Sequence, residues 1–493
     1  MEKEVVIYFD LMAVPGEIQS TVHIDHFGEM IFKKKKLSEN TRDLFKRHNP
    51  AITFFHINSI AELDKLIDHF SLVSYKRYFF INSSFCVTDP DQFLLFLSKI
   101  KFIDDSLAIY KNEDIKSFLR LSKDEIIPLI KLLKHDSSKL FNTLTVQFDN
   151  KVERFRLEQF YIDVRNYLDF VQFLHSNFGL RYFNSIEQKE DVIIKKSTDK
   201  RKMKMEYSYY HLLPGSIKHY FLPTFSYKEE ADHAQYSLER LSVPDLAIQW
   251  IHLSIDDDQF KKLIARLFGF LSARDKRKID VAAMRTHCDE LYLGKVESRF
   301  EKLKGLPVYE RLQKIFSSST PYQSLETLYD RYKSLYTKMS KSKSFGTEQA
   351  IGHGDFCFSN MLYDKRLNLL KLIDPKGGLT LEDIYIDSYY DVAKLSHSIL
   401  GNYDFVNSGQ YELVYNTNLH IRLEIRYHAN LLKKKKLFQD YLAQQGFDLK
   451  IVRLCELSLF LSMVPLHVDN EKNVLGFLLI ACSILEELEN TEI

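Results

Sequence analysis

The sequence predicts an α/β domain with a mainly parallel sheet, followed by an α+β region that starts with strands and becomes largely helical. Short apolar strands alternate with amphipathic helices over residues 1–178, an order typical of parallel strands that helices cover on both faces. A second group of strands begins near residue 181, whereas residues 254–350 and 385–493 have helical periodicity almost throughout. The content of 45% hydrophobic and 27% charged residues is that of a globular chain.

The elements of the first domain follow from its apolar runs. Short runs bounded by polar residues predict buried strands, and apolar residues at helical spacing predict the helices between them. The last of these helices places the end of the domain near residue 178. The strands are expected at residues 5–9, 52–55, 78–82 and 106–110, and the helices at residues 59–67, 91–100 and 164–178.

The second region opens with a strand at residues 191–196 and a strongly charged helix at residues 199–211. An apolar seam along this helix, formed by Met203, Tyr207 and Tyr210, is expected to pack on the strands.

Composition excludes several classes of protein. Lys and Arg number 68 against 67 Asp and Glu, so the net charge of +1 gives no electrostatic reason to expect a nucleic acid or a membrane surface as partner. The five cysteines form no C-x-x-C pair, which argues against a disulfide framework and a cysteine zinc site. No apolar run approaches the length of about 20 residues that a membrane-spanning helix needs, and the charged start is unlike a signal peptide. We therefore expect a soluble cytoplasmic protein.

The segment from residue 351 to residue 378 carries the clearest chemical pattern. A loop with Asp355 and Asn360 precedes a predicted hairpin, whose second strand ends at Ile373 and delivers Asp374 to a turn. Two carboxylates and one carboxamide are thus expected to converge at the base of the hairpin. Phosphoryl transfer to a hydroxyl needs this set, because one carboxylate orients the acceptor and takes its proton while the amide and the second carboxylate hold Mg²⁺. Asp355 is the predicted catalytic residue, and Asn360 and Asp374 are the predicted metal ligands.

The motif His353-x-Asp355-x4-Asn360, with Asp374 further along, resembles the aminoglycoside-phosphotransferase and choline-kinase branch of the protein-kinase-like fold. It is more similar still to bacterial phosphotransferases linked to capsule and surface-polysaccharide gene sets. The helix start around Asp391 resembles the segment that supports such sites. The resemblance implies a kinase-like small lobe at residues 179–245 and a helical large lobe at residues 246–493.

The same resemblance implies a phosphate-binding lysine and a glutamate partner in the small lobe. Lys196 is the predicted lysine because it shares a strand face with Val192 and Ile194; Lys195, on the opposite face, is the second choice. Glu206, on the next helix, is the predicted partner.

Residues 236–241 resemble the hinge strand whose backbone meets adenine, so Glu239 and Leu241 are expected at the nucleotide.

Two departures from the family pattern concern the phosphates. Residues 181–186 contain no glycine, so Ser185 or backbone groups would have to hold the phosphates there. Asp374 is followed by Pro375 and Lys376 instead of Phe and Gly, which argues against an activation switch of the protein-kinase type. Lys376 is instead a candidate for neutralising the transferred phosphate or an acidic substrate.

The first domain has a resemblance of its own. Residues 160–167, followed by residues 181–184, resemble the end of a sugar-phosphate nucleotidyltransferase domain fused to such kinases. The Gly-x-Gly-x-x-Arg type of loop is absent from residues 10–17, and the strand that should end in a metal-binding Asp ends in Asn82. A degenerate, structural nucleotidyltransferase-like domain at residues 1–178 is therefore expected.

The leading hypothesis is an ATP- and Mg²⁺-dependent small-molecule kinase. The resemblance alone implies its acceptor, a hydroxyl of a sugar, polyol or amino alcohol of surface-polysaccharide metabolism. A second hypothesis is a non-catalytic binding or scaffold protein that keeps the fold, favoured by the missing glycine loop. A third is a sugar-phosphate nucleotidyltransferase with an inactive kinase tail. Within the motif, His353 is expected to order the loop and Cys357 to be a buried apolar residue.

Overall fold

The computed structural model describes residues 3–103, 106–110, 116–135, 153–156, 160–175, 184–188, 191–342, 345–417, 419–425 and 428–490. The chain divides into two compact units, residues 1–179 and residues 180–493. Each unit has a hydrophobic core of its own.

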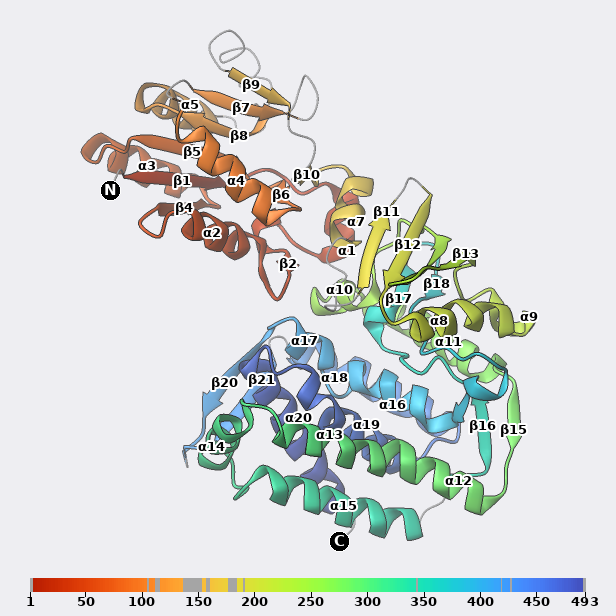
Figure 1. The fold of residues 1–493 in the computed structure, drawn as a ribbon. Helices are drawn as coiled ribbons and strands as arrows, with labels where there is room; N and C mark the ends of the chain where they lie inside the picture. Colours follow the sequence, from red (N-terminus) through yellow and green to blue (C-terminus); the bar gives the residue numbers. More distant parts are fainter. Residues whose placement is uncertain are drawn as a thin grey trace. The chain divides into compact units, whose positions relative to one another are not determined.

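The first unit is built on a six-stranded sheet with the order β4-β1-β5-β8-β7-β9 (Figure 1). The central strand β1 runs parallel to β4 and β5, and β9 runs parallel to β7. β8 is antiparallel to both of its neighbours, so the sheet is mixed where a mainly parallel one was expected. The reason is the short link between β7 and β8, since a parallel crossover needs a dozen residues or more. The strands are β1 (Glu4–Phe9), β4 (Thr53–Ile57), β5 (Arg77–Asn82), β7 (Leu107–Tyr110), β8 (Lys116–Leu121) and β9 (Glu153–Arg156).

Helices cover both faces of this sheet because the central strands β1 and β5 are apolar on both faces between their polar end residues. Val5 and Ile7 of β1 pack under α3 and α5, while Val6 and Tyr8 point to the opposite face under α2 and α4. The covering helices are α2 (Leu37–His48), α3 (Ile60–Leu72), α4 (Pro90–Ile100) and α5 (Lys123–His135). The remaining elements include α1 (Gly16–Val22), β2 (Ile31–Phe32), β3 (Lys35–Lys36), β6 (Phe85–Val87), β10 (Tyr161–Asp163) and α7 (Tyr167–His175).

The second unit opens with a four-stranded antiparallel sheet, in the order β11-β12-β14-β13, and helix α8. Met203, Glu206 and Tyr209 form the buried face of α8, which packs against β12, β13 and β14. The elements are β11 (Asn184–Gln188), β12 (Val192–Ser197), α8 (Lys200–Leu212), α9 (Gly215–Lys218), β13 (Thr224–Glu229) and β14 (Ala234–Glu239).

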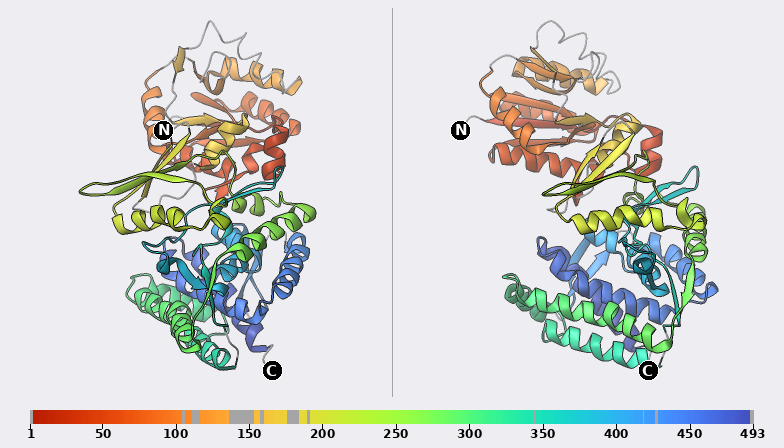
Figure 2. Two further views of the ribbon diagram at one scale, coloured as in Figure 1. Left: turned by 90° about the vertical axis from the view of Figure 1, so that its right-hand side faces the viewer. Right: turned by 45° about the vertical axis from the view of Figure 1, so that its right-hand side comes forward.

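The larger part of the second unit is mostly helical, as expected, and is coloured green to blue in Figure 2. Helix α19 is buried almost all round, because it packs against α13, α16 and α20. The helices are α10 (Leu246–Ile251), α11 (Asp257–Ala273), α12 (Val281–Cys288), α13 (Lys295–Lys304), α14 (Tyr309–Ser319), α15 (Leu325–Ser342), α16 (Ser388–Ile399), α17 (Tyr403–Asn407), α18 (His428–Gln444), α19 (Leu449–Met463) and α20 (Glu471–Asn490).

Three small sheets interrupt these helices. β16 pairs with β15 and β19, and β17 pairs with β18 in a hairpin. The β20–β21 pair lies in a stretch that was expected to be helical, and that expectation is wrong. Leu413, Leu423 and Ile425 alternate along the two strands and pack on the helical core, which explains the strands. The strands are β15 (Lys276–Lys278), β16 (Glu348–Ile351), β17 (Met361–Asp364), β18 (Leu369–Leu372), β19 (Tyr385–Asp387), β20 (Tyr411–Tyr415) and β21 (Ile421–Ile425).

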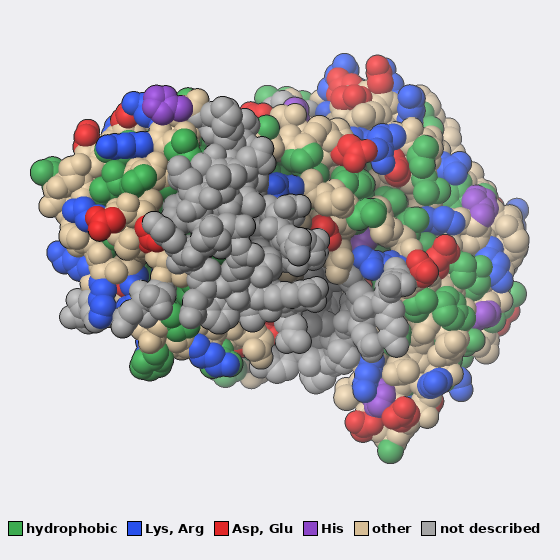
Figure 3. Space-filling view, turned by 90° about the horizontal axis from the view of Figure 1, so that it is seen from above, with side chains coloured by type: hydrophobic (Ala, Val, Ile, Leu, Met, Phe, Trp, Pro, Cys, Tyr) green, Lys and Arg blue, Asp and Glu red, His purple; other side chains and the backbone are tan. Residues whose placement is uncertain are grey.

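Within the part of the chain that the structure describes, no helix is long and apolar enough to cross a membrane. Basic and acidic side chains are interspersed over the described surface in Figure 3, and neither sign gathers there into a large patch.

Candidate active site

The β17–β18 hairpin positions Asn360 and Asp374, as the sequence predicted. Met361 pairs with Leu372, and the Ile373 N–H donates to the Asn360 carbonyl at 3.0 Å. Asn360 therefore stands just before the first strand of the hairpin and Asp374 just after the second. The Asp374 backbone has a positive φ of 56°, so the chain turns sharply at this residue.

Asp391 of α16 holds the loop that leads into the hairpin. Its carboxylate accepts the N–H groups of His353 and Gly354 at 2.8 and 2.9 Å. The Arg274 guanidinium donates to the same carboxylate at 2.9 Å, and both side chains are almost fully buried. Gly354 has a φ of +78°, and a Cβ there would lie 2.6 Å from the Cβ of Lys376. The buried Arg274–Asp391 ion pair and the glycine at position 354 therefore fix the backbone conformation of this loop.

His353 has the ordering role that the sequence predicted. Its Nε2 contacts the Ile373 carbonyl at 2.9 Å, and its Nδ1 faces the Asp355 N–H at 3.2 Å. This pair of partners is that of a neutral imidazole that donates from Nε2 and accepts at Nδ1. Burial lowers the pKa of His353, which favours this neutral form.

Asp355 is fixed on both sides by side chains of the second unit. Its Oδ1 lies 2.8 Å from the Lys394 ammonium, and its Oδ2 accepts the Asn360 amide at 2.9 Å. Partial burial disfavours the charged carboxylate, but Lys394 and Asn360 outweigh it and hold the pKa of Asp355 well below its usual range. With 41% of its side chain exposed, Asp355 is charged, held by two partners and partly open to solvent.

Lys394 was not predicted from the sequence. It lies on α16 three residues after Asp391, so one face of one helix supports both the loop backbone and the Asp355 carboxylate. That spacing is the signal that could have found it. Close by, burial raises the pKa of the Cys357 thiol, which keeps it protonated, as expected of a buried apolar residue.

A chain of ion pairs joins the small sheet to the hairpin. The Lys195 ammonium lies 2.7 Å from Glu206 Oε2 and 2.8 Å from Asp374 Oδ1. Burial of Lys195 would lower its pKa, but the Asp374 and Glu206 carboxylates raise it well above the usual value. The Tyr236 hydroxyl donates to the same Glu206 oxygen at 2.9 Å. Lys195 is therefore a firmly charged link between α8 and the end of β18.

The predicted pairing of Lys196 with Glu206 is wrong, because Lys195 makes that contact and Lys196 is exposed. The prediction took the face with Val192 and Ile194 as the one that meets α8. The face that α8 covers carries Lys195 and Ser197 instead, both buried. The second choice from the sequence is thus the residue at the site.

The other predicted residues lie close to these elements. Glu239 ends β14 and is exposed, Leu241 follows it and is half-buried, and Lys376 is exposed in the turn after Asp374. Contact of Glu239 and Leu241 with adenine stays a prediction. Residues 181–183 and the Ser185 side chain lie outside the described residues, so phosphate binding there stays a prediction as well.

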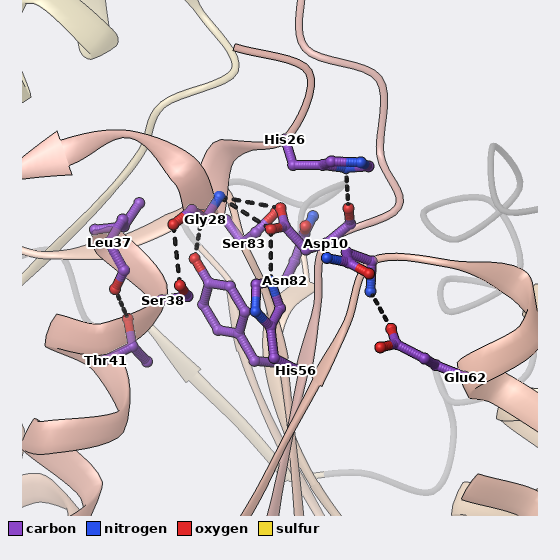
Figure 4. A network of polar contacts seen from close by, with 12 residues as sticks. Asp10, His26, Gly28, Leu37, Ser38, Thr41, His56, Glu62, Asn82 and Ser83 are labelled. Carbon is purple, nitrogen blue, oxygen red and sulfur yellow. Dashed lines mark hydrogen bonds and ion pairs between the residues drawn. The ribbon is translucent and has the colours of Figure 1, made fainter. Parts of the chain in front are cut away.

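The first unit holds a buried polar network at the edge where its parallel strands end (Figure 4). Asp10, directly after β1, accepts the Gly28 N–H at 3.1 Å and contacts His56 Nε2 at 2.8 Å. A Cβ at Gly28 would lie 2.3 Å from the Asp10 carboxylate, so only glycine allows this approach. Asn82 ends β5, as expected, and its amide contacts the Met12 sulfur.

Comparison with known proteins gives structural likeness alone. No family model matches the sequence, and no curated protein matches it. A thermostable mutant of aminoglycoside phosphotransferase APH(4)-Ia, in a ternary complex with AMP-PNP and hygromycin B, is similar with 10% identity and a TM-score of 0.37, over 64% of this chain and 97% of that one. The streptomycin–ATP–APH(2")-IIa ternary complex has 13% identity and a TM-score of 0.34, over 63% and 92% of the two chains. An aminoglycoside-3'-phosphotransferase of type VIII has 12% identity and a TM-score of 0.30, over 63% and 99%.

Proposed function

We propose that the second unit is an ATP- and Mg²⁺-dependent phosphotransferase that acts on the hydroxyl of a small molecule. The observation that carries the proposal is the Lys195 ammonium, which bridges Glu206 and Asp374 at 2.7 and 2.8 Å. A lysine on a strand, a glutamate on the next helix and an aspartate beyond the catalytic loop form the arrangement that positions nucleotide phosphates in kinases.

The donor set fits a Mg²⁺ ion. Within the described part of the chain, Lys195 is the one hydrogen-bond partner of the Asp374 carboxylate, through Oδ1, so Oδ2 remains for a cation. The Asn360 amide nitrogen donates to the backbone carbonyl and to Oδ2 of Asp355, so the amide oxygen Oδ1 remains for a cation. Hard oxygen ligands of this kind suit Mg²⁺, which when bound neutralises charge on the phosphates.

Asp355 is the proposed catalytic residue. The acceptor hydroxyl gives its proton to a carboxylate oxygen of Asp355, the hydroxyl oxygen bonds to the γ-phosphorus of ATP, and the bond between that phosphorus and ADP breaks. Lys195 binds the phosphates of ATP, and Glu206 keeps Lys195 in place. Glu239 and Leu241 are proposed to meet the adenine.

The finer assignments rest on the sequence resemblance. We propose a surface-polysaccharide substrate, and a degenerate nucleotidyltransferase-like role for the first unit, supported by Asn82 at the end of β5 and by the internal partners of Asp10. We also propose a cytoplasmic location, because all five cysteines are free and buried.

One observation favours the second candidate, a non-catalytic scaffold. Both oxygens of Asp355 already have partners within the chain, Lys394 and Asn360. An acceptor hydroxyl would have to bind this carboxylate in addition to Lys394 and Asn360. In a non-catalytic protein with the same fold, Asp355 would serve only to link these two side chains.

A pair of neighbouring lysines tests the proposal. Lys195→Met should abolish stabilisation of the full chain by ATP and Mg²⁺, measured as a melting shift, because Lys195 would bind the phosphates. Lys196→Met is the matched control and should keep the shift. Ligand at about 100 times its dissociation constant stabilises a protein by about 2.7 kcal/mol, which is easily seen. Absence of any shift in the unmodified chain would favour the scaffold.

A further inference from the structure

Two lysines of the helical part of the unit, Lys394 and Lys295, contact Asp355 and its neighbour on α16, Tyr390. Lys394 and Tyr390 lie four residues apart on α16 and so share one face of the helix. Lys394 contacts Asp355, as described above. Lys295 of α13 donates to the Tyr390 hydroxyl at 2.9 Å and lies 5.3 Å from the centre of its ring.

Lys376 is the third lysine of this group. Its backbone N–H donates to the His353 carbonyl at 2.8 Å, so the course of the chain at Lys376 is fixed by the catalytic loop. Its side chain is exposed, and its charge lowers the pKa of His287 on α12, after the larger effect of burial. The aliphatic part of the Lys376 side chain lies against Gly354, because a Cβ built at Gly354 would come within 2.6 to 3.5 Å of its Cβ, Cγ and Cδ atoms. Gly354 directly precedes Asp355, so Lys376 lies next to the loop that carries the proposed catalytic carboxylate.

The pKa of Tyr390 reflects the positive charge of the lysines around it. Burial of the phenol would raise its pKa, yet Lys295, Lys394 and Lys376 lower it below the usual value. Three ammonium groups thus act on one phenol that is only 3% exposed. We call Lys295, Lys376 and Lys394 the acceptor-side lysines.

Nearby carboxylates do not cancel this charge. Asp391 is paired with Arg274, Asp355 with Lys394, and Asp387 accepts the Tyr292 hydroxyl. No carboxylate of the described residues lies within 4.0 Å of the Lys295 or Lys376 ammonium. The Lys376 ammonium therefore has no carboxylate partner among the described residues, and the Lys295 ammonium has the Tyr390 hydroxyl and ring as partners but no carboxylate.

We infer that the acceptor is an anion, a hydroxyl compound that carries a phosphate or a carboxylate, which Lys376 and Lys295 bind while Asp355 holds its hydroxyl. This inference rests on the proposed function and narrows it. It disfavours an amino alcohol, because a cationic acceptor would be repelled by the uncompensated ammonium groups, whereas an anion gains charge-assisted hydrogen bonds.

The experiment compares acceptors that share a carbon skeleton and differ in the charged group that they carry. The melting temperature of the full chain is measured with glycerol and glycerol 3-phosphate, and with glucose, glucose 6-phosphate, glucuronate and glucosamine, each with and without AMP-PNP and Mg²⁺. The anionic compounds should stabilise the chain, and the neutral and amino compounds should not. The phosphate and carboxylate compounds distinguish the two kinds of anion.

Two lysine variants locate the effect. Lys376→Met changes an exposed side chain and should weaken apparent binding of the anionic compound about tenfold, as expected for the loss of one charge-assisted hydrogen bond. Lys295→Met should act in the same direction. Lys302→Met, an exposed lysine on the same helix as Lys295, is the matched control and should leave binding unchanged.

The inference fails if no anionic compound stabilises the chain more than its neutral counterpart, or if glucosamine is preferred. It also fails if Lys195→Met abolishes the effect of the anion, since the anion would then occupy the proposed phosphate site of ATP. If AMP-PNP and Mg²⁺ do not bind although the anion effect persists and depends on Lys376, the proposed function fails and the anion site stands.

Discussion

Removal of the Lys394 ammonium should move the acid limb of activity to higher pH. Lys394 lies 2.8 Å from Asp355 Oδ1 and has 19% of its side chain exposed. An opposite charge at such a distance shifts the pKa of a carboxyl by about 1–3 units. Because 41% of the Asp355 side chain is exposed, solvent screens the pair, and a shift of about 1–2 units is expected.

The same pair contributes to stability with a definite sign. The pKa of Asp355 is lower in the folded chain than its ordinary value, so the contribution is present above the unfolded-state pKa of about 3.9 and is lost as the pH falls through the folded-state pKa. Screening at this exposure leaves a loss of about 1–2 kcal/mol for Lys394→Met at neutral pH.

The assay is the pH profile of kcat/KM, which reports the pKa of the base in the free enzyme. Lys394→Met should show an acid limb about 1–2 units above that of the unmodified chain. Lys394→Arg keeps the charge and should restore the original limb. An unchanged limb in a folded Lys394→Met variant, or an equal shift in Lys394→Arg, would refute the argument that Lys394 sets the charge of Asp355.

Two further predictions concern stability. Burial raises the pKa of Asp404 to about 7, so this residue destabilises the fold progressively as the pH rises from the unfolded-state pKa toward that value; Asp404→Asn should therefore raise the melting temperature at pH 8 by more than at pH 5, and an equal effect at both would count against it. Gly28→Ala places a Cβ 2.3 Å from the Asp10 carboxylate and should destabilise the chain by about 1–3 kcal/mol in urea unfolding, whereas Gly16→Ala, with open space around it, is the control and should cost clearly less.

The placement of the hairpin residues could be predicted because it is local in sequence. Asp355, Asn360 and Asp374 lie within twenty residues of one another, and the strand β18, which ends at Leu372, sets where Asp374 falls. Lys394 could not be predicted in the same way. It reaches Asp355 only because α16 packs against the loop, and that packing is a tertiary contact.

The choice between Lys195 and Lys196 shows a second limit. The two-residue period of a strand separates the faces but does not say which face a helix will cover. The face with Val192 and Ile194 is the more apolar, yet the helix α8 covers the other one, where Glu206 contacts Lys195. The strand β8 was missed because its polar residues Lys116 and Arg120 mask the apolar pattern.

Transfer of the γ-phosphate of ATP to a hydroxyl acceptor tests the central claim most directly. Phosphorus NMR of the full chain with ATP, Mg²⁺ and the acceptor that stabilises it best should show a new phosphate ester together with ADP. Asp355→Asn keeps the hydrogen-bonding shape of the side chain and should lower the rate at least about a hundredfold, the contribution of a general base, while the melting shift with ATP and Mg²⁺ persists. Ester formation at an unchanged rate in Asp355→Asn would contradict the assignment, and nucleotide binding without any ester would contradict the claim that this unit is a phosphotransferase.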